Sequence, residues 1–180
     1  MTLPPTPAQT VGPFFGFSLP YDGGPHLVPP GRADAVRLHG RVLDGAGDPV
    51  PDAILELWQA GPDGQVVQQA GSLHRDGWTF TGWGRAATDN EGRYSFTTLR
   101  PGSVDGGAPF FAVVVLARGL LDRLLTRAYL PGDHLAQDPL LAAVGDRRDT
   151  LVAVEDETGF VFDVHLQGDR ETVFLTHPRD

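Results

Sequence analysis

The chain has 180 residues, of which 41% are hydrophobic and 21% charged, and its formal net charge is −9 at pH 7. This length fits one domain with a substantial core, and no apolar run reaches the ~18 residues that a membrane-spanning helix needs. The absence of cysteine excludes disulfides, thiolate nucleophiles and metal–sulfur sites, and the negative charge without a basic stripe argues against nucleic-acid binding.

Residues 1–35 are predicted to form an extended arm. Proline and glycine are frequent there, as in 27–31 (Leu-Val-Pro-Pro-Gly), and they resist both helices and ladder hydrogen bonds. Residues 11–17 (Val-Gly-Pro-Phe-Phe-Gly-Phe) are too apolar for a solvated tail, so we expect the arm to pack on a partner or on the chain's own core domain, 36–180. The N-terminus has neither the basic start nor the continuous apolar stretch of a signal peptide, and a cytoplasmic location is expected.

From Val36 onward the hydrophobic pattern has a period of two, since apolar positions alternate with Arg37, His39 and Arg41. Further strands, separated by turns rich in Asp, Asn and Gly, are predicted at 53–58, 94–99, 110–117, 125–130, 160–166 and 172–175. Residues 110–117 lack polar alternation, which predicts a central strand that is covered on both faces. Only 138–144 looks helical, with Asp138 as N-cap and Pro139 at the first position. Short strands of this kind predict a predominantly β chain folded as a sandwich.

The chain contains no local motif for a metal site or for a self-contained nucleophile. Its six histidines, at 26, 39, 74, 134, 165 and 177, never stand at the spacings that aim two imidazoles at one metal. None of the four serines lies in a Gly-x-Ser-x-Gly elbow, which argues against a serine hydrolase. The acidic clusters at 89–91 and 155–157 are interpreted as solvated turns.

Arg127 interrupts an otherwise apolar strand with a charged, planar guanidinium. Two interpretations stay open at this point. The side chain can simply face solvent on an alternating strand, or it can be aimed at a carboxylate or another anion. The turn at 10–13 (Thr-Val-Gly-Pro) similarly reads first as a rigid turn and second as backbone shaped to touch a ligand.

Several motifs in order along the chain resemble those of the intradiol ring-cleaving dioxygenases. They are found at 38–42 (Leu-His-Gly-Arg-Val), 55–60 (Leu-Glu-Leu-Trp-Gln-Ala), 84–85 (Gly-Arg), 92–96 (Gly-Arg-Tyr-Ser-Phe), 100–102 (Arg-Pro-Gly) and 126–133 (Thr-Arg-Ala-Tyr-Leu-Pro-Gly-Asp). The resemblance covers roughly residues 36–175. It implies an all-β fold, an antiparallel two-sheet β-sandwich with an N-terminal arm and few short helices. The arm itself, at 6–15, resembles the α-type subunits of the heteromeric members that act on protocatechuate.

Catalytic members of that family hold a non-haem Fe(III) with two tyrosines and two histidines. The matching positions here are occupied by Val66, Val104, Phe111 and Val113. Because hydrocarbon side chains offer no lone pair, we expect no metal ligand, no cofactor and no catalytic residue in this chain.

The resemblance further implies an αβ hetero-oligomer, in which Fe(III) belongs to a partner β subunit and the isolated chain is inactive. Such an assembly converts protocatechuate and O2 to 3-carboxy-cis,cis-muconate. Residues matching Thr10, Gly12, Pro13 and Arg127 line the cavity from the α side in that family, which implies that these four residues bind substrate. The alternative is a stand-alone, non-enzymatic β-sandwich binding module, which has little use for an aromatic arm. A self-sufficient homomeric dioxygenase is excluded by the four missing ligands.

Overall fold

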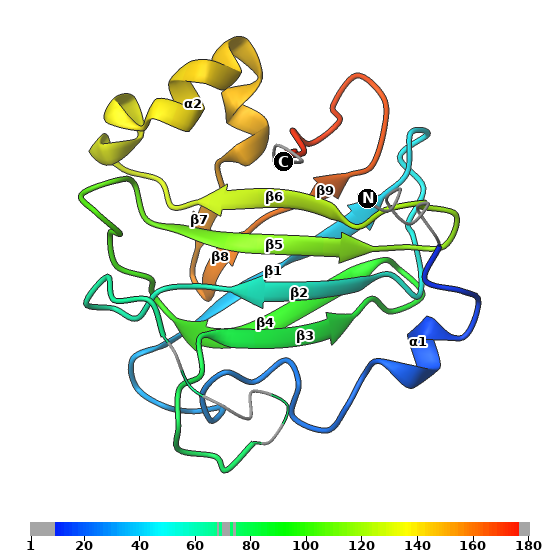
Figure 1. Ribbon diagram of the computed structural model, residues 1–180, viewed down its shortest axis with the longest axis horizontal. Helices are drawn as coiled ribbons and strands as arrows, with labels where there is room; N and C mark the ends of the chain where they lie inside the picture. Colours follow the sequence, from blue (N-terminus) through cyan, green and yellow to red (C-terminus); the bar gives the residue numbers. More distant parts are fainter. Residues whose placement is uncertain (1–9, 68, 70–72, 74, 177–180) are drawn as a thin grey trace, which may run out of the picture.

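The chain folds into two facing sheets (Figure 1). The computed structural model describes residues 10–67, 69, 73 and 75–176. One sheet has the order β3-β2-β5-β6, with β2 at Ile54–Trp58, β3 at Trp83–Ala87, β5 at Phe110–Leu116 and β6 at Leu124–Tyr129. The other has the order β4-β1-β8-β7, with β1 at Ala35–Leu43, β4 at Arg93–Leu99, β7 at Val154–Asp156 and β8 at Gly159–Val161, and with β9 at Val164–His165 also paired to β1. The predicted two-sheet sandwich is confirmed.

Four short helical segments complete the part of the chain that the structure describes. They are α1 at Phe15–Ser18, η1 at Asp133–Gln137, α2 at Pro139–Val144 and η2 at Gly145–Leu151. The Asp138 carboxylate accepts hydrogen bonds from the backbone N–H groups of Leu140 and Leu141, at 2.9 and 3.1 Å, as an N-cap does. The predicted helix and its cap are therefore confirmed, and η1, α2 and η2 together form a helical unit beside β6 (Figure 1).

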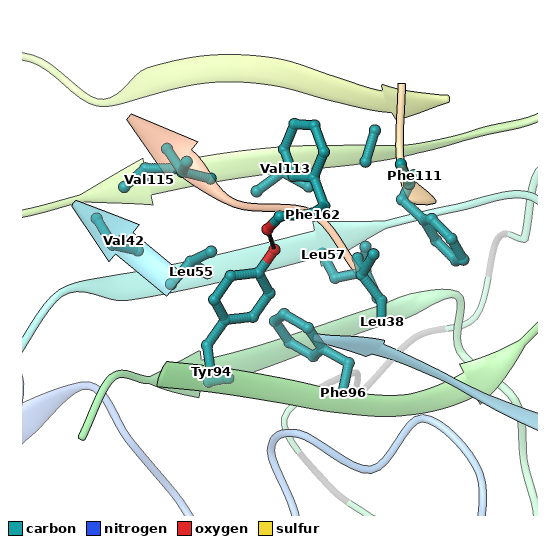
Figure 2. Packing of buried hydrophobic residues seen from close by; sticks show 14 of the residues in the cluster. Leu38, Val42, Leu55, Leu57, Tyr94, Phe96, Phe111, Val113, Val115 and Phe162 are labelled. Atoms are coloured by element: carbon teal, nitrogen blue, oxygen red, sulfur yellow. Dashed lines mark hydrogen bonds between the residues drawn. The ribbon is translucent and has the colours of Figure 1, made fainter. Parts of the chain in front are cut away.

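The core lies between the two sheets, where alternate side chains from both interdigitate (Figure 2). On β1 the buried positions are Leu38, Gly40 and Val42, as the alternation predicts. On β5 the inward residues are almost fully buried, whereas its outward residues are only half-buried. This strand is central, as expected, but its outer face is partly open. Each buried Leu, Val or Phe contributes about 1.5–3 kcal/mol to folding.

The strand expected at 160–166 is interrupted at Phe162 and Asp163, which separate β8 from β9. Gly40 of β1 lies so close to Phe162 that a Cβ there would be 2.1 Å from the Phe162 carbonyl oxygen. The Arg41 N–H bonds to the Asp163 carboxylate, at 2.8 Å, so a side chain takes the place of a ladder carbonyl. Both β8 and β9 run parallel to β1, so the sheet is mixed rather than purely antiparallel.

The prediction of a strand at 172–175 is wrong, because this segment forms only an isolated bridge between Leu175 and Leu125. Side-chain hydroxyls bond other backbone groups of this segment: the Val173 N–H donates to the Thr150 hydroxyl at 3.2 Å, and the Val173 carbonyl oxygen accepts from the Thr126 hydroxyl of β6 at 2.9 Å. The alternation at 172–175 thus reflects packing against β6 without strand pairing. In turn, β3 and β7 were not predicted as strands.

The described part of the arm packs on the outer face of β3. Tyr21 stacks on Trp83, with ring centroids 6.1 Å apart and an interplanar angle of 5°. Arg85 of β3 bonds the Leu19 carbonyl oxygen at 2.8 Å and forms an ion pair with Glu56 of β2 at 2.6 Å. The arm is not wholly extended, since α1 forms one helical turn.

The aromatic run of the arm divides between two environments. Phe15 is buried, whereas Phe14 and Phe17 are 72% and 86% exposed. Residues 1–9 of the arm lie outside the described residues. Within the described ranges, no helix has the length and apolar character needed to span a membrane.

Candidate functional site

Two of the four positions that the family resemblance matches to iron ligands lie inside the sandwich. Phe111 and Val113 both point inward from β5 and are 0% and 1% exposed (Figure 2). Phe111 packs on Phe160 of the opposite sheet, with ring centroids 6.0 Å apart. Hydrocarbon therefore fills the space at these two positions.

The other two positions, Val66 and Val104, lie in loops at the same end of the sandwich, where β2 ends and β5 begins. These loops touch through their backbones, because a Cβ on Gly64 would lie 2.0 Å from the Ser103 carbonyl oxygen. Val66 is 64% exposed and Val104 is half-buried. Neither loop presents an oxygen or nitrogen side-chain ligand at these two positions.

Iron does not fit this set of residues. Valine and phenylalanine have no donor atom, and inserting an imidazole or phenol would require repacking of the closed core around Phe111. Among the residues that the structure describes, no group of three or more His, Asp or Glu side chains converges to hold a metal.

Arg127 lies on the outer face of the β3-β2-β5-β6 sheet, opposite Ala112. Its guanidinium is 4.0 Å from the ring centroid of Phe110, and its Nη1 donates to the Tyr129 hydroxyl at 3.0 Å. The side chain is half-buried. The outward direction is the one expected on an alternating strand, but a ring and a hydroxyl fix the guanidinium, which distinguishes it from a freely solvated arginine.

The Tyr129 hydroxyl in turn donates to Asp138 at 3.1 Å. Tyr129 is fully buried, in a cluster that includes Leu141 of α2 and Leu151 of η2. Burial raises the pKa of Tyr129, while the adjacent Arg127 lowers it and Asp138 raises it. The hydroxyl therefore stays protonated at neutral pH and can donate to one neighbour while it accepts from the other.

The arm residues with a predicted substrate role form a local turn. The Gly12 N–H bonds to the Thr10 hydroxyl at 3.2 Å, and Gly12 has a φ of 79°, a backbone conformation that glycine adopts without strain. Thr10 and Pro13 are exposed. In Figure 1 the blue segment that leads into α1 runs at the right edge, whereas α2 lies at the upper left. In the described part of the chain, no hydrogen bond or ion pair joins this turn to Arg127.

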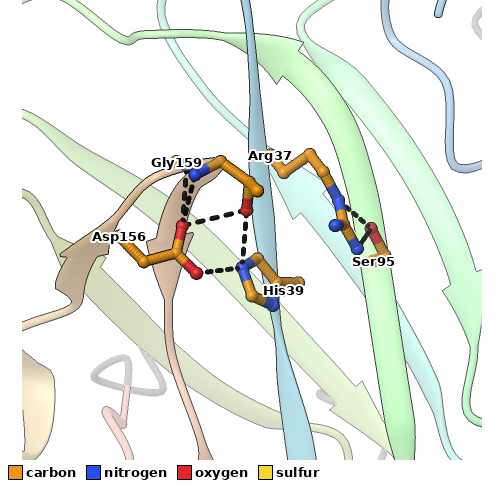
Figure 3. A network of polar contacts seen from close by, with 6 residues as sticks. Arg37, His39, Ser95, Asp156 and Gly159 are labelled. Carbon is orange, nitrogen blue, oxygen red and sulfur yellow. Dashed lines mark hydrogen bonds and ion pairs between the residues drawn. The ribbon is translucent and has the colours of Figure 1, made fainter.

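A separate polar network occupies the outer face of the other sheet (Figure 3). His39 Nε2 lies 3.0 Å from the Asp156 carboxylate, which also accepts from the Gly159 N–H at 2.9 Å. Backbone and side-chain hydrogen bonds from Thr158 are the main causes that lower the pKa of Asp156. These bonds fasten the β7–β8 turn onto β1, so we assign the network a structural role. The lining of a cleft of about 650 Å³ beside it includes the exposed arginines Arg37, Arg41 and Arg93.

The sequence of the chain matches the family model described as Dioxygenase over residues 11–168. The chain belongs to the intradiol dioxygenase family. It is 37% identical to a protein named protocatechuate 3,4-dioxygenase alpha chain from Burkholderia cepacia, over 97% of this chain and 98% of that one. A protein of the same name from Pseudomonas putida is 34% identical, with 96% of each chain covered. The beta chain from Burkholderia cepacia is 33% identical over 75% of this chain and 65% of that one.

Solved intradiol dioxygenase structures share the fold. The dioxygenase domain of a carbohydrate-binding fusion protein from Streptomyces sp. SirexAA-E has a TM-score of 0.59 at 24% identity, covering 92% of this chain and 99% of that one. Catechol 1,2-dioxygenase from Pseudomonas arvilla C-1 has a TM-score of 0.57 at 22% identity, covering 86% of this chain and 60% of that one. At these identities the likeness supports the sandwich architecture alone.

The sequence pattern alone does not reveal the partners of Arg127. Tyr129 stands two residues after Arg127 in the same strand, and this spacing puts both side chains on one face. Asp138 was recognised only as a helix cap. That its carboxylate also reaches the Tyr129 hydroxyl depends on how the helical unit packs against β6, which no local pattern reveals.

Proposed function

We propose that this chain is the iron-free α-type subunit of a protocatechuate 3,4-dioxygenase. It forms an αβ hetero-oligomer with a β subunit that holds Fe(III) and performs the ring cleavage of protocatechuate by O2. In the assembly this chain supports the partner and supplies part of the wall of the substrate cavity. The isolated chain has no dioxygenase activity of its own.

The observation that carries the proposal is similarity over nearly the full length of two alpha chains, 97% and 96% of this chain, combined with hydrocarbon at all four ligand positions. A homologous beta chain is also similar to this chain, which supports a pair of related subunits. The inward packing of Phe111 and Val113 further supports a chain that keeps the sandwich and has no metal site.

We assign Arg127 to the cavity wall, where its guanidinium interacts with the carboxylate of the substrate. A charged, outward-facing and fixed arginine on an open sheet face suits recognition of an aromatic acid. A second part of the cavity wall is proposed to come from the turn at Thr10, Gly12 and Pro13, through its backbone and the Thr10 hydroxyl. The turn and Arg127 lie apart in one chain, so the two parts of the wall are separate in this proposal.

Co-expression with the β chain from the same source tests the proposal. The two chains should co-purify with stoichiometric iron, show the visible absorption of tyrosinate-bound Fe(III) and cleave protocatechuate with uptake of O2. The α-type chain purified alone should contain no stoichiometric iron and should not cleave protocatechuate.

Two results would overturn the proposal. Stoichiometric iron in the isolated chain would show that it builds a metal site of its own. A folded chain that stays separate from the β chain during size exclusion, while the β chain is fully active alone, would establish the stand-alone binding module instead.

A further inference from the structure

Two groups hold the guanidinium of Arg127 at the edge of the helical unit. The ring of Phe110 lies beneath it, and the Tyr129 hydroxyl accepts a 3.0 Å hydrogen bond from Nη1. Behind this hydroxyl lies Asp138, which receives its proton in a 3.1 Å hydrogen bond. Arg127, Tyr129 and Asp138 thus form a chain of hydrogen bonds that leads from the helix cap to the outer face of the sheet.

Tyr129 and Asp138, at the buried end of this series of hydrogen bonds, are held rigidly. Tyr129 and Asp138 are 0% and 5% exposed, and one oxygen of Asp138 also accepts both N-terminal N–H bonds of α2. Tyr129 is packed against Phe110, with ring centroids 5.5 Å apart. Because neither side chain can rotate without breaking a buried bond, the hydroxyl presents its acceptor in one fixed direction.

The Tyr129 hydroxyl separates the Asp138 carboxyl group from the Arg127 guanidinium, and this leaves most of the guanidinium donors unused. A carboxylate placed directly on an arginine forms a two-bond pair that occupies the guanidinium fork. Here the described contacts engage Nη1 alone, through a neutral oxygen. Of the five N–H donors of the guanidinium, the others remain available to an incoming carboxylate.

We propose that Tyr129 and Asp138 are positioning residues, which hold the Arg127 guanidinium with its fork open toward the carboxylate of the substrate. The inference rests on the proposed function and extends it to two residues that do not touch substrate. It makes the helical unit part of the cavity, since Asp138 joins the cap of α2 to the guanidinium.

A double-mutant cycle in the co-purified αβ complex tests the inference. The variants are Tyr129→Phe, Arg127→Ala and the combination of both, and the readouts are kcat/KM for protocatechuate, iron content and melting temperature. Loss of one hydrogen bond to the guanidinium should lower kcat/KM about threefold to tenfold in Tyr129→Phe. In the Arg127→Ala background the same substitution should cause no further loss, because the hydroxyl acts only through the guanidinium.

Tyr94→Phe is the matched control. It also removes the hydroxyl of a buried tyrosine, one that bonds the Phe162 carbonyl oxygen and has no contact with Arg127. It should lower the melting temperature and leave kcat/KM unchanged. If Tyr129→Phe behaved in the same way, with lower stability and unchanged kcat/KM, the tyrosine would be structural and the inference would fail.

Other outcomes separate the inference from the proposed function. Equal losses from Tyr129→Phe with and without Arg127 would show that the hydroxyl acts by another route, and would overturn the inference alone. An unchanged kcat/KM in Arg127→Ala would remove both the inference and the assigned role of Arg127, while assembly and iron content would still test the subunit pairing. If Tyr129→Phe does not assemble, the cycle is run with Asp138→Asn, since asparagine also caps helices.

Discussion

The hydroxyl of Tyr94 donates a 2.5 Å hydrogen bond to the carbonyl oxygen of Phe162 inside the sandwich (Figure 2). Phe162 lies where β8 gives way to β9, at the break in strand pairing beside Gly40. A carbonyl group in such a break needs a partner, because a buried acceptor without one is costly. Tyr94 of β4 thus reaches past β1 and stabilises the break between β8 and β9.

Tyr94→Phe should therefore lower the free energy of unfolding by about 1–3 kcal/mol, the cost of an unsatisfied buried carbonyl group. Burial raises the pKa of Tyr94, so the wild-type hydroxyl stays protonated and the difference should persist across the neutral pH range. Urea denaturation of both proteins measures it. A difference within about 0.5 kcal/mol, as for ordinary surface substitutions, would show that water or a shifted backbone satisfies Phe162.

Arg127→Ala in the αβ complex should lower turnover or apparent affinity for protocatechuate about tenfold to a hundredfold, since a charge-assisted hydrogen bond contributes about 1.5–3 kcal/mol. Iron content should not change. Arg127→Lys should recover only part of the loss, because an ammonium lacks the planar fork. Arg41→Ala, at an exposed arginine on the other sheet, is the control and should stay within about twofold. If Arg127→Ala also stayed within this range, Arg127 would not belong to the site.

Phe14 and Phe17 expose large apolar surfaces, and the partner chain is the expected cover. Replacing both with serine should weaken association with the β chain, as should deletion of residues 1–17, which also removes the buried Phe15. The double substitution is the cleaner test because it leaves the packed part of the arm intact. Titrated size exclusion measures the dissociation constant, and Val154→Ser, an exposed apolar residue on β7, is the control. Full-strength association of the double variant would exclude the arm from the interface.

The described structure predicts one component of the pH dependence of stability. Burial is the main cause that lowers the pKa of His165, and Arg170 lowers it further. The unfolded chain, with a histidine pKa of about 6.5, therefore binds the proton at a higher pH than the folded chain. Stability should fall as the pH drops below this value, through the lowered pKa of the folded state. His165→Gln should reduce this fall in urea denaturation, and His134→Gln, at an exposed histidine, is the matched control. Identical pH profiles for wild type and His165→Gln would contradict the assignment.

Phe111→His, which places an imidazole at one of the four positions that the resemblance matches to iron ligands, should destabilise the chain by about 2–4 kcal/mol. The substitution loses aromatic contacts with Phe160 and buries a polar ring without a partner. Phe17→His makes the same change at an exposed position and should have little effect. Equal stability of the two variants would show that the core around Phe111 accommodates an imidazole.

Alternation and turn chemistry predicted most of the sandwich from the sequence. The faces of β1 and the cap at Asp138 follow local rules, and the structure confirms both. The break at Phe162 was not predictable in this way. It depends on a distant glycine, Gly40, and on a side chain, Asp163, that replaces a backbone acceptor.

Part of the candidate site could likewise be predicted from the sequence, and part could not. Hydrocarbon at the four positions that the resemblance matches to iron ligands is visible in the sequence, as is an arginine on an alternating strand. Which neighbours fix that arginine is decided by the packing of the helical unit onto β6, between segments that have no shared local pattern. The supporting residues therefore emerge only from the structure.

The double use of Asp138 limits how the cavity can be redesigned. Its carboxylate starts a helix and also anchors the hydroxyl beside Arg127. An engineer who seeks a new substrate preference by altering Asp138 would disturb folding and recognition together. Phe110 touches the guanidinium from the half-buried outer face and takes no part in the cap of α2. A library centred on Phe110, with Asp138 held constant, varies the surroundings of Arg127 and leaves the start of α2 intact.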